Sequence, residues 1–105
     1  MTIQFNTDKH LTVHEEFNSK LTALLEKKMN RFSDNITRLE VHLSDDNGGK
    51  FGQNDKKCLL EARIEHRSPV AVSAEGSSYE AAVEGAVEKM RSALDTIFGR
   101  LSDHK

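Results

Sequence analysis

Residues that could bind a metal ion or act as a nucleophile are few in this chain and poorly spaced for either role. There are five histidines and one cysteine, and their order matches no zinc-binding motif. His10 and His14 are four residues apart, but the predicted start of a helix lies between them. Cys58 shares the alternation phase of buried apolar neighbours, which predicts a small core residue and not a reactive thiol. We therefore expect no catalytic site, no metal and no cofactor.

The polar segment 45–57, with the sequence DDNGGKFGQNDKK, has residues typical of ligand-binding loops but matches none of them. It begins with Asp45, Asp46 and Asn47 like a calcium loop, yet the glycine and the bidentate acid are missing at the required offsets. No Gly-Lys-Ser/Thr follows its glycines, so it is not a phosphate-binding loop. The segment is predicted to be a long hairpin connection, in which Phe51 either stacks on a base or packs the loop against a sheet.

The remaining candidates for a binding function are the lysines and arginines, which attract phosphate groups. The 15 Lys plus Arg are balanced by 17 Asp plus Glu to a net charge of −2, which excludes a strongly basic, indiscriminate nucleic-acid binder. In both segments with helical spacing, however, acidic residues come early and basic residues come late. This order complements the helix macrodipole, and it also concentrates positive charge at one end of each helix.

Two segments have apolar residues at the spacing of an amphipathic helix. The first opens with Thr12 and Glu15, a reciprocal capping arrangement, and ends before the polar residues 33–35. The second repeats the capping arrangement with Ser77 and Glu80. The apolar positions of the two helices are Phe17, Leu21, Leu24, Leu25 and Phe32, then Tyr79, Val83, Ala86, Met90, Leu94, Ile97 and Leu101.

Four shorter segments alternate polar and apolar residues, which predicts strands with one buried face. The predicted strands are residues 2–6, 36–44, 58–67 and 70–76. Their polar face mixes both signs of charge and is expected to be solvated and linked by cross-strand pairs. With 105 residues, strands and helices are expected to form a single domain, residues 1–105.

The order β-α-β-β-β-α predicts an α+β fold, a four-stranded mixed sheet with two parallel helices packed on one face. A strand-helix-strand unit usually makes a right-handed crossover that leaves its strands parallel, whereas the turn at Ser68 and Pro69 and the 45–57 loop each reverse the chain. The basic ends of the two helices should then lie together. The residues that we expect to contact RNA phosphates are Lys20, Lys27, Lys28, Arg31, Lys89, Arg91 and Arg100.

The expected location is the cytoplasm. No apolar run approaches the ~18 residues that a membrane span needs, and the first residues lack the pattern of a signal peptide. The single cysteine fits a reducing compartment. No membrane partner and no small-molecule substrate are expected.

The second half of the chain carries a recognisable series of motifs. The stretch 74–85, AEGSSYEAAVEG, is followed by EKM at 88–90, and it is preceded by the segments 36–44, KKC at 56–58 and PVAV at 69–72. In this order, they resemble the last helix and the second to fourth strands of the ribosome hibernation promoting factor and ribosome-associated inhibitor (sigma-factor modulation) family. The resemblance covers nearly the whole chain.

This resemblance implies a non-catalytic protein that binds ribosomal RNA of the small ribosomal subunit near the decoding region. It would exclude messenger and transfer RNA and help to store idle ribosomes during stress. In the family, the contacts come from basic side chains on the two parallel helices. The chain resembles the short form, without an additional dimerising domain, so a monomer or weak dimer is expected.

The chain departs from the family in its last helix, where relatives carry a pattern like K-L-x-R-x-L-x-K. Lys89 matches the first basic position, whereas the next two are Ser92 and Thr96. Arg91 is displaced by one residue and therefore points about 100° away around the helix. The alternative function is a protein-interaction module on the same scaffold, with lost or weak ribosome binding.

Overall fold

The computed structural model describes residues 1–7, 15–45 and 56–102, which form a four-stranded sheet and two α-helices. The order β-α-β-β-β-α confirms the prediction from sequence. The elements are β1 (Thr2–Thr7), α1 (Glu15–Met29), the 3₁₀ turn η1 (Asn30–Phe32), β2 (Ile36–Asp45), β3 (Lys56–Ile64), β4 (Val70–Gly76) and α2 (Tyr79–Ser102).

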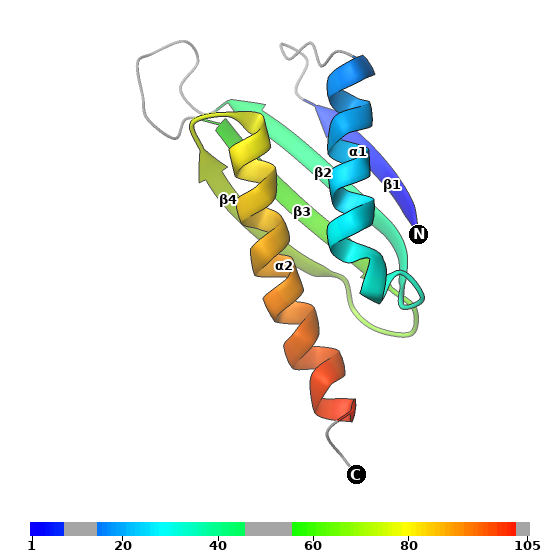
Figure 1. Ribbon diagram of the computed structural model, residues 1–105. Helices are drawn as coiled ribbons and strands as arrows, with labels where there is room; N and C mark the ends of the chain where they lie inside the picture. Colours follow the sequence, from blue (N-terminus) through cyan, green and yellow to red (C-terminus); the bar gives the residue numbers. More distant parts are fainter. Residues whose placement is uncertain (8–14, 46–55, 103–105) are drawn as a thin grey trace.

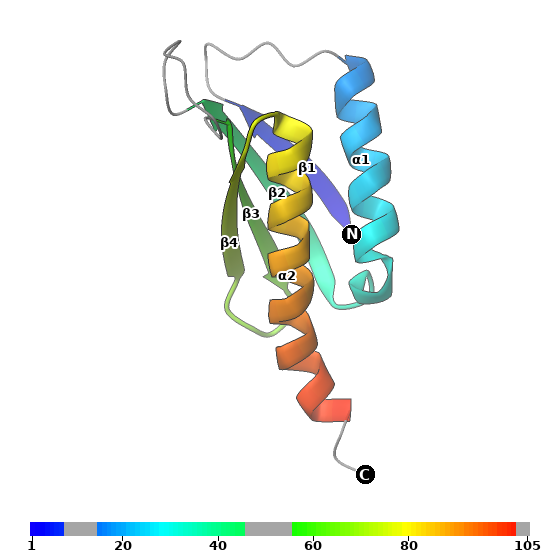
Figure 2. The same ribbon diagram turned by 60° about the vertical axis from the view of Figure 1, so that its left-hand side comes forward.

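The strands lie in the order β1-β2-β3-β4, so sequence neighbours are also neighbours in the sheet. β1 pairs with β2 in parallel, with Phe5 beside Val41, and the other two pairings are antiparallel. Both helices cover the same face of the sheet and run in the same direction (Figures 1 and 2). The structure therefore confirms the predicted α+β fold with parallel helices. The C-terminal part of α2 extends beyond the end of the sheet (Figure 1).

The core lies between the sheet and the helices. In β2, Leu39, Val41 and Leu43 point into it, and α1 adds residues one turn apart, such as Leu21 and Leu25. Each fully buried side chain of this kind contributes about 1.5–3 kcal/mol relative to an exposed one. The other buried hydrophobic residues are Met29, Phe32, Ile36, Cys58, Leu60, Ala62, Ile64, Ala74, Ala82, Val83, Ala86, Val87, Met90 and Leu94.

Cys58 is a core residue, as its alternation phase predicts. Its side chain is fully buried under the helices. Desolvation by burial raises the pKa of the Cys58 thiol to about 12. The thiolate, which is the nucleophilic form, is therefore not populated near neutral pH.

The start of α2 differs by one residue from the capping arrangement predicted at Ser77 and Glu80. The Ser78 hydroxyl accepts the hydrogen bond, 3.1 Å from the backbone N of Ala81. β4 continues to Gly76, whose backbone lies so close to α2 that an added Cβ would be 2.8 Å from the backbone N of Ala82. Ser77 is then needed to connect the strand to the helix, and Ser78 becomes the N-cap of α2.

Other boundaries also shift. β3 begins at Lys56, two residues before the predicted start at Cys58. It ends at Ile64 and not at residue 67, because the backbone turns at His66, which has a φ of 63°. Phe32 is in the 3₁₀ turn after α1 and not in the helix itself. The predicted Thr12 cap, the pair His10 and His14, and Phe51 with most of its loop lie outside the described residues. Among the described residues, no helix is long and apolar enough to cross a membrane.

The outer face of the sheet is polar and is organised around Glu40. The strand register places Arg38 opposite Arg63 and Glu40 opposite Glu61, which sets like charges against each other. The repulsion is relieved because both arginines reach Glu40, at 3.1 Å from Arg38 Nε and 3.2 Å from Arg63 Nε. Asn6 of β1 donates a further hydrogen bond of 3.4 Å. Glu40 therefore links β1, β2 and β3, as the cross-strand pairing predicts.

The Glu40 carboxyl is only 12% exposed. Desolvation acts to raise its pKa, but the hydrogen bond from Arg63 and the charge and hydrogen bond of Arg38 outweigh this effect and hold the pKa below its usual range. The ionised form is thus favoured by the folded state. Its contribution to stability is present above the unfolded pKa of about 4.3 and is lost as the pH falls through the lower folded value.

We expect Glu40→Gln to lower the melting temperature at pH 7, because it removes the charge that Arg38 and Arg63 share. The difference from the unchanged protein should shrink as the pH falls below about 4. Thermal unfolding followed by circular dichroism from pH 3 to pH 8 measures this. Glu75→Gln, at an exposed position of β4, is the matched control, and a Glu40→Gln deficit that stays constant down to pH 3 would contradict the assignment.

Candidate nucleic-acid interface

The C-terminal end of α1 carries three of the predicted cations close together. Leu21, Leu25 and Met29 of α1 are fully buried against the sheet. Lys27 and Lys28 lie in the last turn of the helix and Arg31 in the following 3₁₀ turn, and all three residues are exposed. We call Lys27, Lys28 and Arg31 the α1 basic end.

The side of α2 that faces α1 is acidic. Glu80, Glu84 and Glu88 are four residues apart, and Asp95 continues the row two turns later. Glu80 Oε2 lies 3.1 Å from Lys20 Nζ, and Asp95 forms an ion pair with Arg31. Charges of opposite sign therefore face each other along the boundary between the two helices.

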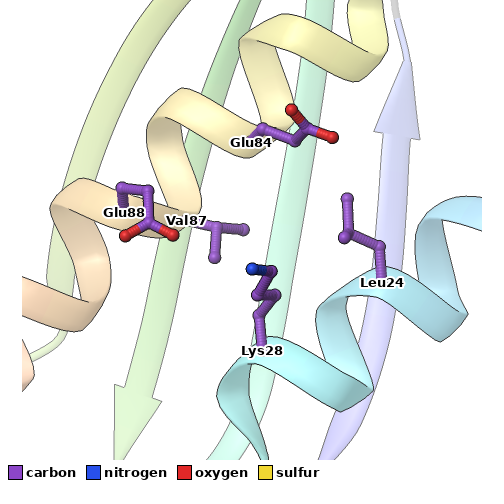
Figure 3. A pocket seen from close by; sticks show the side chains of 5 residues that line it. All are labelled: Leu24, Lys28, Glu84, Val87 and Glu88. Carbon is purple, nitrogen blue, oxygen red and sulfur yellow. The ribbon is translucent and has the colours of Figure 1, made fainter.

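A cavity of about 190 Å³ lies at this boundary and is lined by Leu24 and Lys28 of α1 and by Glu84, Val87 and Glu88 of α2. Figure 3 shows Leu24 and Lys28 reaching from α1 toward α2. The ammonium group of Lys28 thus lies in a region with negative charge on the opposite helix. It remains exposed to solvent.

The cations of α2 lie on two different sides of that helix. The ammonium of Lys89 donates a hydrogen bond of 2.7 Å to the backbone oxygen of Ser73 in β4, the edge strand of the sheet. Arg91 forms an ion pair of 3.2 Å with Glu88. Arg100 belongs to α2, but its side chain lies outside the described residues. Lys89 therefore does not join the α1 basic end, and the displacement of Arg91 places it on the acidic side of α2.

The predicted set of seven cations is thus only partly brought together. The parallel direction of the helices is confirmed (Figure 2), but Lys20, Arg31 and Arg91 face carboxylates. The side chains in the Lys20 and Arg31 pairs are between 40% and 64% exposed. Such surface ion pairs contribute about 0.2–1 kcal/mol, so a phosphate group can replace the carboxylate partner at small cost.

The carboxylate partners were not identified from the sequence. In the sequence, Glu80 fits a helix cap and the early acidic residues of α2 fit the macrodipole, and neither interpretation predicts that they face cations of α1. Their four-residue spacing was the available signal, because it places them on one side of the helix. Over the described part of the chain, no group of three His, Cys, Asp or Glu side chains could hold a metal ion.

Comparison with known proteins places these features in a family. The model of the family described as "Sigma 54 modulation protein / S30EA ribosomal protein" matches residues 6–102, which confirms the resemblance seen in the sequence. Comparison with curated protein sequences gives no match.

Solved structures with the same fold include the N-terminal domain of Protein Y from Thermus thermophilus. It has a TM-score of 0.71 and 18% sequence identity, and the alignment covers 92% of this chain and 99% of the other. A ribosomal subunit interface protein from Coxiella burnetii has a TM-score of 0.69 and 19% identity, with 94% and 99% coverage. At these identities the likeness concerns the fold alone.

The ion pair between Arg31 and Asp95 should contribute little to stability. In a double-mutant cycle with Arg31→Gln and Asp95→Asn, we expect a coupling energy of no more than about 1 kcal/mol, because both side chains are exposed. The coupling should decrease further in 1 M salt. Chemical denaturation of the four proteins at low and high salt measures it. A salt-insensitive coupling of more than about 2 kcal/mol would mean that Arg31 is not available to another anion.

Proposed function

Because the chain belongs to the Sigma 54 modulation protein / S30EA ribosomal protein family, whose members are non-enzymatic, ribosome-associated factors, we propose that it binds the small ribosomal subunit through ribosomal RNA near the decoding region. It acts there by occupancy, excludes messenger and transfer RNA, and keeps ribosomes idle in the cytoplasm during stress. Family membership also agrees with the expectation that the chain is not an enzyme.

The α1 basic end is the observation that carries the proposal. Its three exposed cations lie within about one helical turn of each other. Within the described residues, neither Lys27 nor Lys28 has a carboxylate oxygen within 4 Å. Both ammonium groups are therefore available to phosphates, and each contact with RNA releases condensed counterions.

The charge balance supports a structured target over an arbitrary RNA strand. The net charge is −2, and Glu84 and Glu88 lie beside Lys28. RNA can approach only with its phosphates placed over the cations and away from these carboxylates. This restriction favours a fixed arrangement of phosphates, as in a folded ribosomal RNA, which is recognised mainly by its shape.

Replacing both lysines of the α1 basic end, Lys27→Gln with Lys28→Gln, is expected to weaken binding to purified small subunits roughly tenfold or more at 0.1 M salt. The slope of log affinity against log salt should fall by about 1.5, since two phosphate contacts are lost. Co-sedimentation at several salt concentrations measures both quantities. Prebound messenger and transfer RNA should compete with the unchanged protein.

Lys57→Gln is the matched control, because it removes the same type of charge from β3 on the outer face of the sheet, away from the helices. Its binding should equal that of the unchanged protein. If the unchanged protein remains free even at low salt, the proposal is wrong, and the alternative of a protein-interaction module on this scaffold takes its place. Lys89→Gln tests the β4 side of α2 separately.

Removing the carboxylate that faces Arg31 should have the opposite effect. Asp95→Asn frees the guanidinium of Arg31 for phosphate, so affinity for small subunits is expected to rise about two- to fivefold, the equivalent of one surface ion pair. The same co-sedimentation measurement detects it. The control is Glu75→Gln, which removes one negative charge from an exposed position of β4. Equal gains from both variants would indicate a general charge effect and not a specific masking of Arg31.

A further inference from the structure

The turn between β3 and β4 brings an additional arginine to the α1 basic end. The backbone N of Glu65 donates to the oxygen of Asn35, 3.3 Å away, and the backbone N of Arg67 donates to the oxygen of Ile64, 3.2 Å away. Asn35 comes three residues after η1. The turn is therefore anchored to the connection that follows Arg31, at the same end of the sheet (Figures 1 and 2).

Two phenylalanines connect this turn with the helices. The guanidinium of Arg31 lies 4.7 Å from the centre of the Phe32 ring, and that of Arg67 lies 5.8 Å from the centre of the Phe98 ring. The rings of Phe32 and Phe98 are themselves in contact, with centroids 6.3 Å apart. Both arginines are within the range of a cation–π interaction. An Arg-Phe-Phe-Arg series thus runs from η1 across α2 to the β3–β4 turn.

We propose that Arg67 is a further contact for the backbone phosphates of the RNA that binds the α1 basic end. This inference rests on the proposed function and extends its surface around the end of the molecule. Arg67 is exposed, and among the described residues no carboxylate oxygen lies within 4 Å of it. Within the described ranges, no hydrogen bond uses the guanidinium N–H groups of Arg67, which can therefore make a bidentate contact with a phosphate.

The two arginines differ in how much of their charge is available. Arg31 is already paired with Asp95, whereas Arg67 has the Phe98 ring as its described contact. Among the residues that the structure describes, a phosphate at Arg67 therefore has no carboxylate to compete with.

The test is binding of Arg67→Gln to purified small subunits between 50 and 300 mM salt, by co-sedimentation. We expect an affinity about fivefold lower at 0.1 M salt and a salt slope reduced by about 0.7–0.9, the value for one phosphate contact. Arg67→Lys should restore most of the slope but only part of the affinity, because lysine keeps the charge and loses the planar fork. Circular dichroism confirms that the variants fold.

The controls separate this inference from the proposed function. Lys57→Gln removes one charge from the outer face of the sheet, and it should leave both affinity and slope unchanged. If the unchanged protein binds and the Lys27 and Lys28 variant is weakened while Arg67→Gln binds normally, the role of Arg67 is refuted and the proposed function stands. If the unchanged protein does not bind at any salt concentration, both fail. A loss with Lys57→Gln equal to that with Arg67→Gln also refutes a specific contact.

Discussion

Burial of one face of the sheet is the constraint on which the rest of the structure depends. The two central strands direct their apolar side chains to one side, from Ile36 to Leu43 in β2 and from Cys58 to Ile64 in β3. Such a face must be covered, and two amphipathic helices are available to cover it. Because β1 and β4 run in the same direction and each precedes a helix, both helices return across the sheet in parallel. The position of every candidate contact follows from this arrangement.

Because the two helices are parallel, the end of each helix that carries basic residues lies beside the corresponding end of the other. Repulsion between these basic residues would destabilise the contact, and the acidic residues of α2 reduce it. If both helices presented only cations to each other, the like charges would destabilise their contact. α2 instead presents a row of carboxylates to the cations of α1, with Glu80 at Lys20 and Asp95 at Arg31. The same row lowers the positive potential that the RNA would meet. Contact between the helices and the proposed RNA binding thus place opposite demands on these side chains.

The sequence was sufficient for the fold because its signals are local. Alternation in β2 and β3 and helical spacing in α1 and α2 depend on neighbours a few residues apart, and the crossover rule then fixes the topology. Ser78 took the place of Ser77 as the cap because the close approach of Gly76 to α2 is a tertiary effect. Two adjacent serines cannot be distinguished without it.

The candidate site was less predictable because its contacts join distant parts of the chain. Lys20 and Glu80 are 60 residues apart, and Arg31 and Asp95 are 64 apart. The bond from Lys89 to the Ser73 carbonyl depends on which side of α2 lies over the edge strand. Alternation predicts Arg67 at the end of a strand over residues 58–67, but β3 ends at Ile64. The alternation therefore does not indicate which residues Arg67 approaches. Charge order along a helix predicts where cations gather, but not which of them meet a carboxylate.

The resulting surface favours selectivity over strength. Each exposed ion pair contributes about 0.2–1 kcal/mol. A phosphate that displaces Asp95 from Arg31 loses this contribution, so it gains less binding free energy than a phosphate that contacts Lys27. An RNA whose phosphates fall at random meets carboxylates as often as cations, because the chain has a net charge of −2. An RNA whose phosphates match the positions of the cations gains binding free energy at each contact, because each contact releases counterions. Under the proposed function, discrimination between RNAs depends on the geometry of their phosphates, and the acidic row of α2 increases this discrimination by making a mismatched approach repulsive.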